Sequence, residues 1–181
     1  MSTDSSPIAD DRNGIPLAGL SRLKSSLQEV PTKQLVAAIM TGFLGSIPLG
    51  LMMQYGNPEP LIALALPSMY GLVGPDIALG WAIHQFHGIA LALMFVVAVQ
   101  WPPIQGSAKT LRGSLGLAVL VGVGTTALLS VFLMPLWLQA VGYPYAPTFP
   151  DLTIPEKFWS VGGHIVYALP VTVGYALLAG E

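Results

Sequence analysis

The sequence contains no cysteine and has few charged residues. Only 9% of its 181 residues are Asp, Glu, Lys or Arg, whereas soluble domains carry about 25%. Without cysteine, the chain cannot form a disulfide scaffold, a thiolate metal site or a Cys nucleophile. Seven Lys and Arg against nine Asp and Glu provide no basic face for a nucleic-acid partner. The composition argues against an ordinary soluble enzyme, and we expect a non-enzymatic membrane protein.

Five stretches of the chain lack charged residues altogether: 34–58, 60–75, 77–108, 113–150 and 158–180. A helix needs about 20 mainly apolar residues to cross the hydrocarbon core, so the stretch 60–75 is too short. The apolar runs are continuous, which favours helices over alternating barrel strands. We therefore predict an all-α integral membrane four-helix bundle in 34–181, with spans Leu35–Met53, Ile77–Trp101, Gly113–Val141 and Phe158–Gly180.

The positive charges predict the topology of these spans. They fall before the first span (Arg12, Arg22, Lys24, Lys33), between the second and third (Lys109, Arg112) and before the fourth (Lys157). Six of these seven charges lie on one side if both termini face the cytoplasm, and positive charge favours that side. We expect a multi-pass protein of the cell membrane with the lipid bilayer as its surroundings.

Two shorter segments carry their own predictions. The segment 1–33 is expected to be cytoplasmic, and apolar residues at three- and four-residue spacing within 16–30 indicate a short amphipathic helix. A frayed linker is the alternative for this segment. The stretch 60–75 is bounded and broken by Pro and Gly, which favours a short interfacial helix between spans 1 and 2.

The second and fourth spans share a pattern that indicates an internal repeat. His84, Gly88, Ala92 and Phe95 have the same spacing as His164, Ala168, Thr172 and Tyr175. Residues four apart lie on one helix face, and small residues on such a face let membrane helices pack closely. We predict a duplicated helical hairpin, and the simplest arrangement pairs the two faces with each other.

Several motifs resemble a group of small four-helix membrane proteins of unknown function from haloarchaea and other prokaryotes. The motifs are the run Met134–Gly142, Gly163-His164-Ile-Val-Tyr167, Gly174-Tyr175, and Gly80-Trp81 with His84. The resemblance covers about residues 34–180. It implies the four-span fold and no particular activity.

All three histidines, His84, His87 and His164, fall inside predicted spans, where ionisable residues are functional candidates. The simplest hypothesis is that they hydrogen-bond across helix interfaces, with Tyr167 or a Thr, Ser or backbone carbonyl as partner. A second is that His84 and His164 hold haem or another redox cofactor between facing helices. A third is that His84, His87 and His164 together bind a transition metal, and a fourth is proton or solute transport.

The sequence thus predicts a non-enzymatic membrane subunit or interaction module without a resident cofactor. A partner is expected to be a second copy of the chain or another membrane protein. The alternative is a histidine-based cofactor or transport protein. The residues expected to pack or hydrogen-bond between helices are Gly88, Ala92, Phe95, Tyr167, Ala168, Thr172 and Tyr175.

Overall fold

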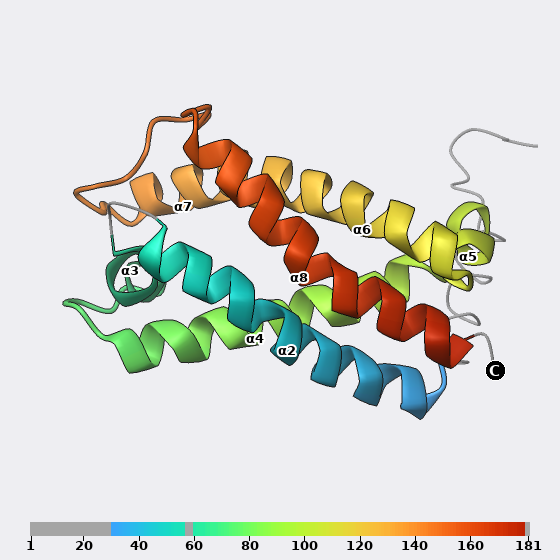
Figure 1. The fold of residues 1–181 in the computed structure, drawn as a ribbon. Coiled ribbons are helices and arrows are strands. Elements are labelled where there is room, and N and C mark those ends of the chain that lie inside the picture. The colour runs from blue at the N-terminus through green and yellow to red at the C-terminus, as the bar shows by residue number, and fades with distance from the viewer. Residues whose placement is uncertain (1–29, 57–59, 180–181) are drawn as a thin grey trace, which may run out of the picture.

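A computed structural model describes residues 30–56 and 60–179 of the chain. These residues form helices and connecting loops, and none of them lies in a β-strand. Four long helical segments are present among the described residues, and they run along most of the length of the molecule (Figure 1). Each of the four is long and apolar enough to span a membrane. The all-helical, four-span architecture predicted from the sequence is therefore confirmed in this part of the chain.

The spans lie close to their predicted positions. The first is α2, Thr32–Tyr55, and the second is α4, Ile77–Ala98. The third is a continuous rod made of α6, Leu111–Thr125, the π-helix η2, Thr126–Leu133, and α7, Met134–Ala140. The fourth is α8, Glu156–Ala179. Predicted ends differ from these by at most three residues, because helix ends follow caps and turns more than hydropathy.

Two short helical segments connect the spans. The stretch predicted as an interfacial helix contains η1, Leu61–Ala65, and α3, Leu66–Met69, whose apolar residues pack against α4 and α7. Its depth relative to a bilayer stays a prediction. The helix α5, Pro102–Ala108, follows α4 and was not predicted separately from the second span. The predicted amphipathic helix within 16–30 lies almost entirely outside the described residues.

The long helices pack in the order α4, α2, α8, α6, with each helix contacting the next extensively. Figure 1 shows α8 lying between α2 and α6, while α4 crosses behind α2. The remaining neighbour contact of a closed bundle, between α4 and the third span, is nearly missing. At one end η1 and α3 contact α4, and α3 also contacts α7; at the other, α5 packs on α6 and α8. The two hairpins are thus not joined symmetrically, and the predicted duplication remains a hypothesis.

Small residues allow the closest approach of α2 and α4. A Cβ added to Gly42 would lie 2.7 Å from the Ala92 Cβ, and one added to Gly88 would lie 2.6 Å from the Ser46 Cβ. The small residues Gly88 and Ala92 of α4 therefore pack on α2. The simplest repeat model had instead placed them against the matching face of α8. The reason is that α2 supplies its own complementary small residues, Gly42 and Ser46, at the crossing.

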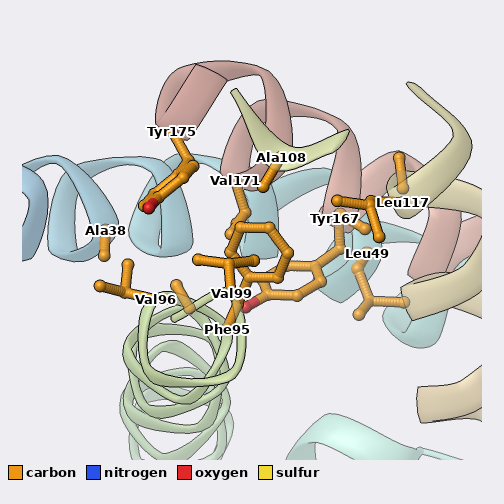
Figure 2. Packing of buried hydrophobic residues seen from close by; sticks show 13 residues of the cluster. Ala38, Leu49, Phe95, Val96, Val99, Ala108, Leu117, Tyr167, Val171 and Tyr175 are labelled. Atoms are coloured by element: carbon orange, nitrogen blue, oxygen red, sulfur yellow. The ribbon is translucent and has the colours of Figure 1, made fainter. Parts of the chain in front are cut away.

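Larger side chains connect α4 to α8 around this crossing. Phe95 and Tyr175 meet edge to face with ring centroids 5.9 Å apart, and the Tyr167 hydroxyl donates to the Gly88 carbonyl over 2.6 Å. Figure 2 shows Tyr167, Phe95 and Tyr175 within one apolar cluster together with Leu49 and Val171. All seven residues predicted to pack or hydrogen-bond between helices are buried.

Candidate functional site: polar groups inside the bundle

The three histidines and their hydrogen-bond partners lie in the half of the molecule that carries α3 and the loop before α8. They come from α2 and α4 on one side of α8 and from the third span on the other. Buried polar groups must find partners, because an unpaired donor or acceptor in an apolar medium costs several kcal/mol. The partners of each histidine therefore indicate what that histidine does.

His84 connects α4 to α2. Its ring is buried, and its Nε2 atom lies 2.8 Å from the Ser46 carbonyl oxygen. A carbonyl only accepts, so Nε2 carries the proton and donates this bond. The Ser46 hydroxyl donates to the Phe43 carbonyl over 2.8 Å and also contacts the Gln85 side chain. The Trp81 ring meets His84 edge-on. This is the interhelical hydrogen bonding that the sequence predicted as the simplest histidine role.

His164 connects α8 to the third span. Its Nδ1 atom lies 2.8 Å from the Ser160 carbonyl oxygen of its own helix and 3.1 Å from the Thr126 hydroxyl. Bonding to a carbonyl again requires the proton to be on Nδ1, so Nε2 keeps its lone pair. The Thr126 hydroxyl donates to the Gly122 carbonyl over 2.9 Å, which leaves it free to accept from the imidazole.

His87 faces a different neighbour from the other two histidines. Its Nε2 atom lies 2.5 Å from the Tyr70 hydroxyl, and the Tyr70 ring also contacts the Trp137 ring with centroids 5.7 Å apart. His87 therefore helps to join α4, α3 and α7 at the end where the bundle is otherwise open between α4 and the third span.

The three histidines are not gathered as the metal hypothesis requires. Among residues 30–56 and 60–179, no group of three or more His, Asp or Glu side chains is placed to hold a metal ion. The predicted set of His84, His87 and His164 is corrected accordingly: their rings point to α2, α3 and the third span respectively. The reason is that His84 and His87, although three residues apart, face different neighbours of α4.

The two histidines of the hypothetical cofactor pair form hydrogen bonds at different helix interfaces. His84 uses Nε2 to donate to Ser46 on one side of α8, and His164 uses Nδ1 at the interface with the third span on the other. The apolar groove of about 340 Å³ on the surface is lined by Leu93, Met94, Val97 and Ala98 of α4 and by neither histidine.

The sequence did not predict a polar cluster at the beginning of α8. The Lys157 ammonium forms an ion pair with the Asp151 carboxylate over 2.5 Å and donates to the Ser130 hydroxyl over 3.1 Å. Asp151 is only 7% exposed, and it also accepts from the Thr153 hydroxyl over 2.6 Å. The available signal was the small group of charges, Asp151, Glu156 and Lys157, that follows the Pro-rich loop 142–150. Hydropathy alone treats these charges as the beginning of a span.

Burial and bonding have opposite effects on the Asp151 carboxylate. Burial raises its pKa, but the hydrogen bonds from Lys157 and Thr153 and the positive charge of Lys157 lower it by more. The pKa of Asp151 therefore lies below its usual value near 3.8. The carboxylate is ionised at neutral pH, so the pair carries both charges.

Comparison of the chain with protein-family models, with curated proteins and with solved structures finds no match. The similarity of its motifs to the small haloarchaeal membrane proteins remains a prediction. The fold and the internal polar groups therefore carry the functional argument.

Proposed function

We propose that this protein is a non-enzymatic membrane subunit, or interaction module, that assembles side by side with another membrane protein or with a second copy of itself. The observation that carries the proposal is the open order α4, α2, α8, α6, in which α4 and the third span are edge helices. The third span packs along α8, and α4 packs along α2 with a smaller contact to α8. Membrane helices gain stability from close packing. An edge helix with an unpartnered face is therefore where a further helix is expected to bind.

The outer face of α4 supports this proposal. Phe86, Met94 and Val97 are exposed there, and Met94 and Val97 line the shallow apolar groove on the C-terminal half of the helix. A groove of this kind accepts the side chains of a facing helix as well as lipid chains. The other edge helix presents Gly116 and Gly124, around which an added Cβ would meet no atom within 4 Å.

The internal histidines support a structural role for the bundle itself. His84 and His164 have a backbone carbonyl as partner and His87 a phenol hydroxyl. The bonds of His84 and His87 tie α4 to α2 and to Tyr70 at the end of α3, and the contact of His164 with the Thr126 hydroxyl ties α8 to the third span. Because each histidine is hydrogen-bonded within the bundle, a packing role is favoured over a catalytic one, as expected for a non-enzymatic subunit.

The test is the mass of the protein extracted from its native membrane in mild detergent. We expect an assembly larger than one chain that is lost when Met94→Trp fills the α4 groove. Met40→Trp, on the exposed outer face of α2, is the matched control and should leave the assembly intact. A monomer in both cases would overturn the proposal.

The same sample distinguishes the alternative of a histidine-based cofactor protein. Its reduced-minus-oxidised absorption spectrum and its metal content are measured together. A haem band or one metal ion per chain that disappears in His84→Ala or His164→Ala would replace the subunit proposal with electron transfer or metal handling. pH-driven flux into vesicles would similarly favour transport.

A further inference from the structure

We infer that the interface between the third span and α8 contains a one-ended polar path that admits water and protons to His164, and that the Asp151–Lys157 ion pair closes its entrance. The inference is independent of the partner proposed above. Two observations support it: the polar side chains that line this interface, and the apolar packing beyond His164.

The path is built from two facing rows of polar residues. On α8, Lys157, Ser160 and His164 recur at three- and four-residue spacing and therefore share a face. On the third span, Ser130 and Thr126 lie opposite. Lys157 contacts Ser130, and His164 contacts both Ser160 and Thr126. Polar side chains thus line this interface in two groups, one at the loop before α8 and one around the imidazole, with Ser130 and Thr126 four residues apart on the third span.

Beyond His164 the interface becomes apolar and tight. An added Cβ at Gly122 would lie 2.4 Å from the Ile165 side chain and 2.7 Å from its backbone nitrogen. Leu117, Ala118 and Ala168 continue this packing and are at most 7% exposed. No space remains there for a file of water molecules, so the path ends at His164.

The entrance is closed by the ammonium group of Lys157. Its amine lies between the Ser130 hydroxyl and the Asp151 carboxylate, and only 18% of the Lys157 side chain is exposed. Asp151 is itself fixed, because its backbone N–H donates to the Val131 carbonyl over 3.0 Å. Without the carboxylate, Lys157 loses the charged partner that holds it there, and its long flexible side chain can turn outward.

The charged and titratable groups around His164 come from three elements. They are Lys157 of α8 itself, Asp151 of the preceding loop through its pair with Lys157, and His84 of α4. The third span contributes only hydroxyls, from Thr126 and Ser130. Removing the Asp151 charge therefore changes the entrance while leaving the direct hydrogen bonds of His164 intact.

The experiment measures how fast a small water-soluble methanethiosulfonate modifies single cysteines in the full chain in membranes. The natural sequence has no cysteine, so each introduced thiol is the only target. Thr126→Cys places the reporter beside His164, where the residue is 3% exposed. We expect slow modification, and a rise of at least about tenfold when Asp151→Asn is added, because the lost bond is charge-assisted.

Two control cysteines make the result decisive. Ser114→Cys introduces a thiol at a fully buried position of the same span, beyond the apolar packing, and should stay unreactive with or without Asp151→Asn. Leu152→Cys, 68% exposed beside Asp151, should react rapidly in both backgrounds. An unchanged rate at position 126 would overturn the inference. So would an equal rise at position 114, since the ion pair would then hold the fold together and not close a path.

Discussion

The backbone N–H of Asp151 donates to the carbonyl of Val131, the residue four positions before Pro135. Proline has no N–H, so the helix itself cannot use that carbonyl in the regular pattern. The same relationship occurs earlier in the chain, where the Asp76 N–H donates over 2.9 Å to the carbonyl of Ala63, four positions before Pro67. Both carbonyls lie in π-helical segments, η2 and η1. In each case, a backbone N–H of the loop before a span donates a hydrogen bond to a helix carbonyl that lacks its regular donor because of a proline.

Replacing Pro135 with alanine tests the hydrogen bond from the Asp151 N–H to the Val131 carbonyl. The new N–H of residue 135 competes for the Val131 carbonyl, so the Asp151 amide loses part of its bond. We expect its hydrogen exchange to accelerate several-fold, in line with a net hydrogen-bond contribution of about 1 kcal/mol. The Asp76 amide, fastened through Pro67, provides the internal control and should exchange at its original rate. Equal acceleration at both amides would show a general loosening instead.

The crossing of α2 and α4 should be sensitive to single methyl groups. Gly88→Ala brings a Cβ to 2.6 Å from the Ser46 Cβ, and such overpacking costs about 1–3 kcal/mol. Gly116→Ala adds the same methyl to an outward face with no atom within 4 Å and removes a helix-breaking glycine. We expect Gly88→Ala to lower the unfolding temperature in detergent and Gly116→Ala to leave it unchanged or raise it. A similar loss for both variants would contradict the close crossing.

Tyr167→Phe removes a single buried hydrogen bond between α8 and α4. The phenol donates to the Gly88 carbonyl over 2.6 Å, and interhelical bonds in membranes contribute about 0.6 kcal/mol, with a maximum near 1.7. We expect a loss of free energy of unfolding within that range, measured by reversible unfolding in mixed micelles. Tyr145→Phe, on a side chain that is 61% exposed, should have no measurable effect. A Tyr167→Phe variant as stable as the natural protein would mean that water replaces the bond.

Hydropathy and charge predicted the spans well, because crossing a bilayer requires long uncharged runs regardless of how helices pack. The packing order was less accessible: Gly88 and Ala92 mark a close contact but do not say that α2 supplies the other side. The histidines, too, could be identified from the sequence, but their hydrogen-bond partners could not. Intramembrane position identified His84 and His164 as candidates, whereas the Ser46 and Ser160 carbonyls that bind them are backbone atoms without a residue-specific signal. Asp151 and Lys157 were missed because their pairing depends on the path of a loop.

The Asp151–Lys157 pair should make stability depend on acid pH. The folded state lowers the pKa of Asp151 below its usual value near 3.8, so the unfolded chain binds the proton more readily. The resulting stabilisation is fully present above that usual value and is lost as the pH falls through the lowered pKa. Unfolding temperatures measured from about pH 6 downward should therefore fall in the natural protein. They should fall less in Asp151→Asn, which has no carboxylate to protonate at this position. Parallel curves for the two proteins would show that the acid sensitivity originates elsewhere in the chain.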